Sequence, residues 1–114
     1  MDAFLEAYIE AALWSEVDHD TEKPLDDDYC IHDLEPATLE KMRADCDKFI
    51  ELAGWMIPEG DAAKAGHDFW LTRQGHGCGF WDGDWPEYGE ELTDACKKFR
   101  TICLYASGGC VWSD

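Results

Sequence analysis

The chain has 114 residues, of which 26 are acidic and 9 basic, so its formal net charge is −17. This length suits a single domain over residues 1–114, and an apolar content of 46% supports a packed core and excludes wholesale disorder. Nucleic acids and anionic membranes are polyanions, so the charge argues against direct binding to either and favours basic protein surfaces or metal ions.

The start of the chain and its cysteines indicate the cellular compartment of the protein. The opening MDAFLEAY has no basic region followed by a long apolar run, so no signal peptide is expected. No run of about 18 apolar residues is present, so no membrane span is expected. We therefore predict a cytoplasmic protein. Its six cysteines are expected to be reduced and mostly to serve as small core residues.

The first predicted element is a helix over residues 3–14. Apolar side chains recur there at i, i+1, i+4, i+5, i+8 and i+9, which is typical of one buried helical stripe. Glu6 and Glu10 are four residues apart and lie on a different face. Asp2 precedes the helix, where a negative charge favours the positive end of the helix dipole.

Residues 15–35 predict an irregular but ordered connection. They hold nine acids and a single base, and Pro24 and the run of three Asp after Leu25 indicate a loop. Four apolar side chains interrupt the acids, so we expect the segment to lie over the core. They are Leu25, Tyr29, Ile31 and Leu34.

The next predicted elements are a helix and then a hairpin. Pro36 suits a first helical turn and Gly54 a helix stop, which predicts a helix over 36–53. Residues 55–66 are expected to form a loop, with a short helical turn at 61–65. Alternation then predicts a strand over 67–73, a glycine turn over 74–77 and a partner strand over 78–82.

A third helix is predicted over 90–100, followed by a second hairpin. Its strands are expected at 101–106 and 110–113, joined across 107–109, where two glycines permit a tight turn. The predicted fold class is therefore α+β. Two N-terminal helices pack on an antiparallel sheet of about four strands, with one further helix.

The first candidate site is the predicted hairpin at 66–82, which gathers side chains able to bind a metal. The alternative set of metal ligands is His67, His76, Cys78 and Asp82, with Asp68 beside them. Zinc sites usually show C-x2-C or H-x3-H spacing, and neither is present. A stiff hairpin whose Phe and Trp side chains pack into the core explains the same residues, and this structural reading is favoured. We expect no cofactor and no enzymatic activity.

The second candidate site is the acidic surface, which is predicted to bind a partner. Carboxylates repeated along a helix and a loop can approximate the phosphates of a DNA strand, although charge runs often form only a solvated face. Tight binding also needs an apolar anchor, for which Trp14, Tyr29, Trp55, Trp85 and Tyr88 are candidates. The predicted partner-binding acids are Glu6, Glu10, Glu16, Asp18, Asp20, Glu22, Asp26, Asp27 and Asp28.

The segment 66–82 also carries a family resemblance. It reads GHDFWLTR-x-GHG-x-GFWD and is similar to a motif of small bacteriophage and mobile-element proteins. That pattern often has Asn where this chain has Gln74 and a basic residue where it has Gly83, so the chain departs from it twice. The resemblance implies a phage or mobile element acting inside a bacterial cell.

Small acidic proteins from such sources often inhibit host enzymes that act on DNA. The targets include restriction enzymes, CRISPR effectors and uracil-DNA glycosylase, and the inhibitors of the last resemble this chain in size and acidity. The leading hypothesis is therefore a DNA-mimicking inhibitor that binds a basic nucleic-acid-binding surface of a host enzyme. A small metal-binding protein or metal-dependent enzyme, and an accessory phage protein with a structural role, remain as alternatives.

Overall fold

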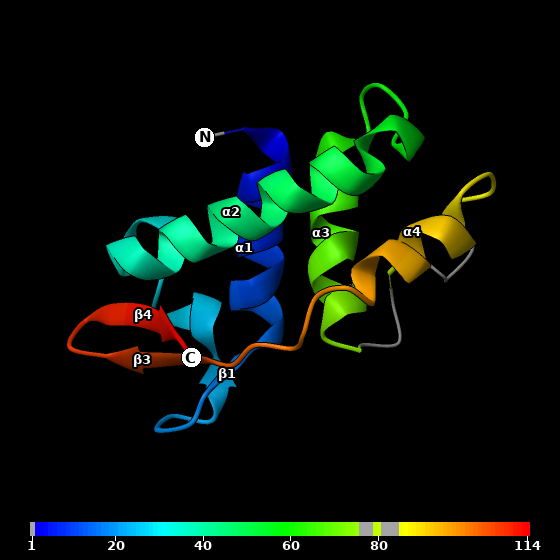
Figure 1. The fold of residues 1–114 in the computed structure, drawn as a ribbon. Helices are drawn as coiled ribbons and strands as arrows, with labels where there is room; N and C mark the ends of the chain where they lie inside the picture. Colours follow the sequence, from blue (N-terminus) through cyan, green and yellow to red (C-terminus); the bar gives the residue numbers. More distant parts are fainter. Residues whose placement is uncertain (1, 76–78, 81–84) are drawn as a thin grey trace.

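The computed structural model describes residues 2–75, 79–80 and 85–114. Within these ranges the chain forms four helices and two separate two-stranded antiparallel sheets, joined by short 3-10 turns (Figure 1). No helix in the described part is long and apolar enough to cross a membrane. In chain order the elements are α1 (Ala3–Ser15), β1 (Val17–Asp18), β2 (Lys23–Pro24), η1 (Leu25–Asp27), η2 (Ile31–Asp33), α2 (Pro36–Ala53), η3 (Gly54–Met56), α3 (Ala62–Arg73), α4 (Gly89–Cys96), β3 (Leu104–Ser107) and β4 (Cys110–Ser113).

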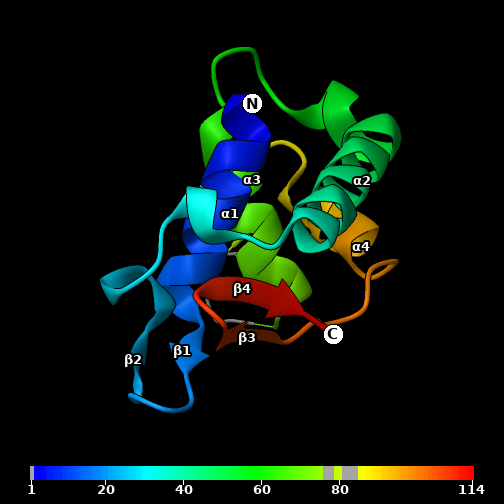
Figure 2. The ribbon, with the colours of Figure 1, turned by 90° about the vertical axis from the view of Figure 1, so that its left-hand side faces the viewer.

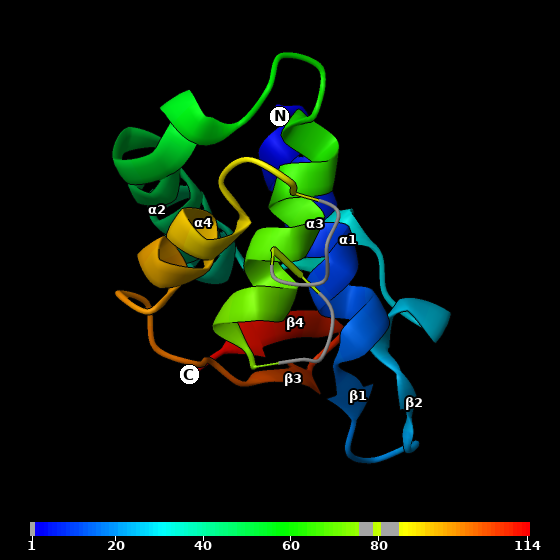
Figure 3. The same ribbon diagram turned by 90° about the vertical axis from the view of Figure 1, so that its right-hand side faces the viewer.

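Helix α1 confirms the first predicted helix. Asp2 caps it, since its carboxylate Oδ1 accepts a hydrogen bond from the backbone N–H of Leu5 at 2.8 Å. The predicted apolar stripe is buried, with Tyr8 and Ile9 wholly inaccessible to solvent. The stripe packs along α3, and the two helices lie side by side in the views of Figures 1 and 3.

Helix α3 replaces the strand that was predicted over residues 67–73, so that prediction was wrong. Its buried side chains include Ala65, Phe69, Trp70 and Arg73, which are spaced for one helical face. Asp68 and Leu71 between them are buried as well, so the second half of the helix is covered on nearly all sides. The polar side chains there mimic the alternation of a strand. The predicted turn at 74–77 and partner strand at 78–82 fall largely outside the described residues.

Gly66 explains why α1 and α3 can lie so close together. A Cβ atom added to Gly66 would overlap the backbone carbonyl oxygen of Phe4 on α1. Glycine at this position therefore lets the two backbones touch without an intervening side chain. This contact fixes the spacing of the two helices on which the candidate site is built.

Helix α2 crosses the α1–α3 pair and closes the core (Figures 1 and 2). It runs over the predicted residues, begins at Pro36 and is capped by Glu35, whose side chain accepts from the N–H of Thr38 at 3.1 Å. Phe49 lies at the centre of the aromatic core, with its ring centroid 4.2 Å from that of Phe69 and 5.7 Å from that of Phe80. Such stacked rings add to the stabilisation from burial alone.

Residues 16–35 form the ordered connection that the apolar side chains predicted. Leu25 is fully buried, Leu34 is buried, and Tyr29 and Ile31 pack against the core while remaining partly exposed. The segment ends in a bridge between Leu34 and Val111 of β4, extended by a 2.9 Å hydrogen bond from the Glu35 N–H to the Val111 carbonyl. Both ends of the acidic segment are therefore attached to the body of the protein.

The C-terminal third confirms the hairpin but not the larger sheet. β3 pairs with β4 in antiparallel register, with Tyr105 opposite Trp112, and the turn uses Gly108 and Gly109 at positive φ. β1 and β2 form a second small sheet, so the predicted four-stranded sheet is wrong while the α+β class holds. α4 ends at Cys96, four residues short of its prediction, because turns follow at 97–99.

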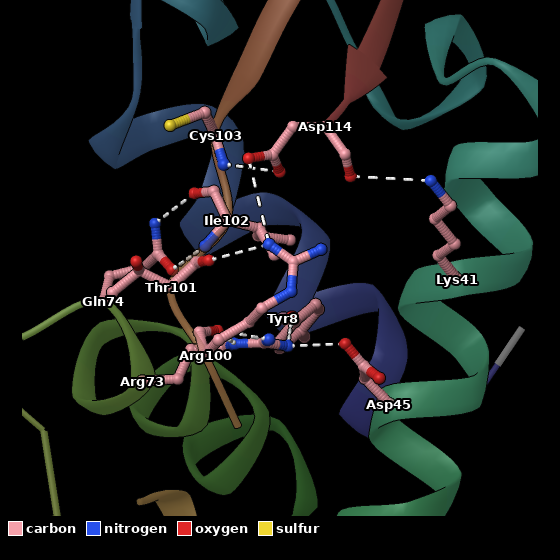
Figure 4. A network of polar contacts seen from close by, with 10 residues as sticks. All are labelled: Tyr8, Lys41, Asp45, Arg73, Gln74, Arg100, Thr101, Ile102, Cys103 and Asp114. Carbon is pink, nitrogen blue, oxygen red and sulfur yellow. Dashed lines mark hydrogen bonds and ion pairs between the residues drawn. The ribbon is translucent and has the colours of Figure 1, made fainter. Parts of the chain in front are cut away.

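Arg73 links three parts of the fold through its buried guanidinium (Figure 4). Nη1 donates to the Tyr8 hydroxyl at 2.9 Å and to Asp45 Oδ2 at 2.7 Å, while Nε and Nη2 donate to the Arg100 carbonyl at 3.1 and 2.6 Å. Burial opposes the charge, but Tyr8 and Asp45 raise the pKa of the guanidinium above its usual value. Arg73 is therefore a fixed positive charge inside the protein.

Gln74 continues this network at the end of α3. Its amide nitrogen donates to the Ile102 carbonyl at 2.6 Å, and its amide oxygen accepts from the Ile102 N–H at 2.9 Å. The side chain thus pairs with residue 102 as a neighbouring β-strand would. Together, Arg73 and Gln74 hold the segment between α4 and β3 against the end of α3 (Figure 4).

Candidate partner-binding cleft

A cleft of about 760 Å³ opens between α1, the first half of α3 and the connection that follows η1. Its volume lies within the range of about 300–1,000 Å³ that is usual for ligand pockets. The lining is largely apolar, with acidic and basic side chains among the apolar ones. It consists of Ala7, Glu10, Ala11, Leu13, Trp14, Asp26, Tyr29, Cys30, Ile31, Ala63, Lys64 and His67.

Small side chains create the space in this cleft. Ala7 and Ala11 are one helical turn apart on the same face of α1, and Ala63 lies in the first turn of α3. A larger residue at any of these positions would fill part of the volume. The i, i+4 pair of alanines was the sequence signal that could have indicated the cleft, and the sequence analysis missed it.

Aromatic side chains form part of the wall. Trp14 is 57% exposed although it is the largest side chain of α1, and its ring centroid lies 6.0 Å from that of His67. Tyr29 is partly buried and packs against the core. An exposed tryptophan beside an apolar hollow is a surface that can enclose an apolar side chain of another protein.

Two of the predicted acids lie at this cleft. Glu10 comes from α1 and Asp26 from η1, and both are exposed. The fold therefore brings together a carboxylate of the first helix and one of the acidic connection, which are 16 residues apart in sequence. Lys64 and His67 also line the cleft, so its lining is not uniformly acidic.

The other predicted acids are distributed along α1 and the connection. Glu6 is exposed on α1, Asp20 and Glu22 are exposed in the turn between β1 and β2, and Asp27 and Asp28 are exposed beside Asp26. Glu16 is partly buried. Asp18 is only 8% exposed and its Oδ1 accepts from the Asp20 N–H at 3.0 Å, so it stabilises the turn from within. Seven of the nine acids are thus exposed.

The predicted aromatic anchors differ in exposure. Trp55 is 72% exposed in η3, which follows α2, and Tyr88 packs against it at a centroid distance of 5.3 Å. Trp85 is buried and is not available as an anchor. Trp14 and Tyr29 are the two predicted anchors that line the cleft with the acids.

The alternative metal site is represented in the described residues by His67 and Asp68 alone. His67 Nδ1 lies 3.3 Å from Asp68 Oδ1, while Asp68 Oδ2 accepts from the Trp85 indole N–H at 2.6 Å. Asp68 is buried, and its bond to Trp85 gives it a structural role. His76, Cys78 and Asp82 lie outside the described residues. Within those residues, no group of three or more His, Cys, Asp or Glu side chains is placed to hold a metal ion.

Comparisons with protein-family models, with curated proteins and with solved structures found no match to this chain. The candidate function therefore rests on the residues and their geometry.

Proposed function

We propose that this protein binds a basic, nucleic-acid-binding surface of a host enzyme and inhibits that enzyme. The observation that carries the proposal is the cleft at which Trp14 lies with Glu10 and Asp26. Acids supply attraction to a basic surface, and the cleft supplies an apolar site for a side chain of the partner. Both components are needed, because charge alone gives fast but weak association.

The charge of the chain supports electrostatic attraction to a basic partner. A net charge of −17 on 114 residues produces a strong field that speeds association with a basic partner and that falls as salt is added. Exposed carboxylates of Glu10, Asp26, Asp27 and Asp28 stand at the cleft or directly beside it in sequence. A basic partner drawn by this field is thus delivered close to the apolar hollow.

The spacing of acids on α1 supports mimicry of DNA. Glu6 and Glu10 are both exposed and are separated along the helix axis by about 6 Å. Two steps along one DNA strand rise by about 6.8 Å along the duplex axis, so the axial rise between the two carboxylates is close to that between alternate phosphates. A DNA-binding enzyme of the bacterial host is the corresponding target, and uracil-DNA glycosylase is the first to test.

An apolar site for a partner side chain explains why aromatic and small residues share the cleft. The alanines leave room, and Trp14 offers a flat apolar face beside that room. Apolar side chains that insert into such hollows slow dissociation and dominate the binding energy of many interfaces. We therefore assign steering to the acids and residence time to Trp14 and its surroundings.

Affinity capture from a bacterial lysate at low salt tests the proposal. The tagged wild-type protein is compared with Glu10→Lys/Asp26→Lys and with the matched control Glu51→Lys/Glu59→Lys, which makes the same change in charge at exposed sites outside the cleft. We expect wild type and control to retain a DNA-binding protein that the cleft variant loses. Recovery of no DNA-binding protein, or equal loss with both variants, would contradict the proposal.

Direct inhibition is the second readout. Purified uracil-DNA glycosylase, a restriction endonuclease and a CRISPR effector nuclease are each assayed with increasing amounts of the protein. Inhibition of one of them that disappears with Trp14→Ala identifies the target and the role of the cleft together. Metal analysis of the same preparations tests the alternative, since a stoichiometric metal that is lost on His76→Ala would favour a metal protein instead.

A further inference from the structure

A second pocket, of about 340 Å³, is unusual in this acidic chain because it is basic. It lies between α2, the end of α3, the segment that follows α4 and the end of β4, and it shares no lining residue with the cleft. Five of the nine basic residues of the chain line it. They are Lys41, Lys48, Arg73, Lys98 and Arg100.

The local charge of this pocket is opposite to that of the molecule. Asp45 and Asp114 are its acidic lining residues, so the lining carries a formal charge of +3. The remainder of the chain then carries −20, given a total of −17. Charges more than a Debye length away, about 8 Å at physiological salt, are largely screened, so a small ion in the pocket experiences mainly the local bases.

Asp45 and Asp114 differ in how closely they pair with these bases. Asp45 is committed to the buried Arg73 at 2.7 Å. Asp114 is held mainly by Cys103, whose N–H donates to Asp114 Oδ1 at 3.1 Å and whose carbonyl accepts from the Asp114 N–H at 3.1 Å. Its contacts to the bases are longer, with its main-chain oxygen 3.5 Å from Lys41 Nζ and its Oδ2 3.9 Å from Arg100 Nη1. Figure 4 shows Lys41 beside the main-chain oxygen of Asp114 and the Arg100 guanidinium below its side-chain carboxylate. Both contacts are longer than a strong charged hydrogen bond.

The two remaining lysines have no acidic partner in the described part of the chain. Lys98 makes no ion pair there, and the Nζ atom of Lys48 lies 6.0 Å from the centroid of the Phe99 ring, outside strong contact. Both are exposed, and both line the pocket. Three lysines and one arginine therefore line a hollow in which Asp114 makes only long contacts to the exposed bases.

We propose that this pocket binds a small molecule bearing phosphate groups, whose oxygens contact Lys41 and Arg100 more closely than Asp114 does. Ammonium and guanidinium groups both bind the oxygens of phosphate, lysine as a point charge and arginine through paired donors. Four exposed bases line the pocket, and the several anionic oxygens of a molecule bearing phosphate groups can contact more of them at once than a single carboxylate can. A long nucleic acid is disfavoured, because its other phosphates would meet the acidic remainder of the protein.

Arg73 contributes to the site from below. Its side chain is 2% exposed and its position is fixed by Tyr8, Asp45 and the Arg100 carbonyl. Arg73 therefore forms a rigid floor of the pocket. Its contacts to the Arg100 carbonyl also hold the backbone that carries the Arg100 side chain. A pre-positioned backbone lowers the entropy loss when an anion binds.

Calorimetric titration with pyrophosphate at constant ionic strength tests the proposal. We expect saturable binding at millimolar concentration or below and a rise in the thermal midpoint with ligand concentration. The variant Lys48→Gln/Lys98→Gln is expected to weaken binding by about tenfold or more. The matched control Lys23→Gln/Lys97→Gln removes the same charge from residues that do not line the pocket, and it is expected to change binding by less than about twofold.

Three outcomes would overturn the proposal. One is the absence of saturable binding up to about 10 mM pyrophosphate, and another is equal weakening by the pocket variant and the control, which would indicate only overall charge. The third is citrate binding more tightly than pyrophosphate, which would assign the pocket to carboxylates. None of these results bears on capture of a basic partner by the cleft, so the two proposals fail separately.

Discussion

Arg73 Nη1 lies 2.7 Å from Asp45 Oδ2, and this ion pair joins the last turn of α3 to the middle of α2. The arginine side chain is almost wholly buried, whereas that of Asp45 is 34% exposed. The pair is therefore accessible to solvent only on the Asp45 side. Its structural importance comes from the arginine, which also holds Tyr8 and the Arg100 carbonyl.

Replacing Arg73 with Met is expected to lower the free energy of unfolding by about 2–4 kcal/mol, because the Tyr8 hydroxyl and the Arg100 carbonyl lose buried donors. The partial exposure of Asp45 places this value below that of a fully buried pair. Urea denaturation measures the change. The control Arg43→Met removes an exposed pair with Glu40, at 3.8 Å, and should change stability by less than about 0.5 kcal/mol. Equal losses would show that Arg73 is not the structural link.

Gly66→Ala is expected to destabilise the protein by about 2 kcal/mol, since the new methyl group would overlap the Phe4 carbonyl and force α1 and α3 apart. The sign of the stability change is diagnostic, because alanine in a helix otherwise stabilises a protein by about 1 kcal/mol relative to glycine. Thermal and urea unfolding measure it. Ala63→Gly, at an exposed position in the same helix, should cost about 1 kcal/mol or less. A more stable Gly66→Ala protein would refute the close contact.

Stability is expected to fall in alkali because buried groups keep their protons. Burial raises the pKa of the Cys96 thiol from an ordinary value of 9.0 to about 12, with Arg73 opposing and Asp68 reinforcing the shift. Between these values the unfolded thiol is ionised and the folded one is not. Below about pH 9 this thiol should leave the free energy of unfolding unchanged. Above that pH, it should lower the free energy of unfolding by about 1.4 kcal/mol per pH unit.

Cys96→Ala tests that contribution. Burial also raises the pKa values of Tyr8 and Cys46. In the wild-type protein, Tyr8, Cys46 and Cys96 should therefore all contribute to the loss of stability as pH rises. In the variant, the slope of unfolding free energy against pH should be shallower by about 1.4 kcal/mol per unit between about pH 9 and 11. Urea titrations at several pH values give the two slopes. Parallel slopes would mean that Cys96 does not titrate as inferred.

The kinetics of partner binding should separate the two components of the proposed function. Asp26→Asn is expected to lower the association rate constant and to reduce its dependence on salt, with Glu51→Gln as a control of equal charge. Trp14→Ala should act on dissociation instead, raising its rate constant by about thirtyfold, which corresponds to about 2 kcal/mol. Surface plasmon resonance with the captured enzyme measures both. An effect of Trp14→Ala confined to association would contradict its assignment as the anchor.

Sequence patterns predicted the elements whose exposed and buried faces differ clearly. α1 and α2 each alternate polar and apolar surfaces, and Pro36, Asp2 and the Gly108–Gly109 turn fix element ends by local backbone chemistry. The buried side chains of Leu25 and Leu34 were likewise predictable from their isolation among acids. In these cases local preference and tertiary packing favour the same structure.

Helix α3 was not predictable in this way because its second half is enclosed on nearly all sides. Two of its buried residues, Asp68 and Arg73, are charged and find partners more than 15 residues away, in Trp85 and Asp45. Such long-range partners leave no periodic signal in the helix itself. The two pockets were missed for the same reason, since each is assembled from segments that are distant in sequence.

The turn between β1 and β2 stands apart from the packed body (Figures 1 and 2). Its base is closed by a 2.9 Å hydrogen bond from the Leu25 N–H to the Glu16 carbonyl, and Leu25 itself is fully buried. Residues 19–22 are all exposed beyond that closure. The length and composition of the turn are therefore free to vary without disturbing the core, which makes it a suitable place for an inserted tag or fluorophore.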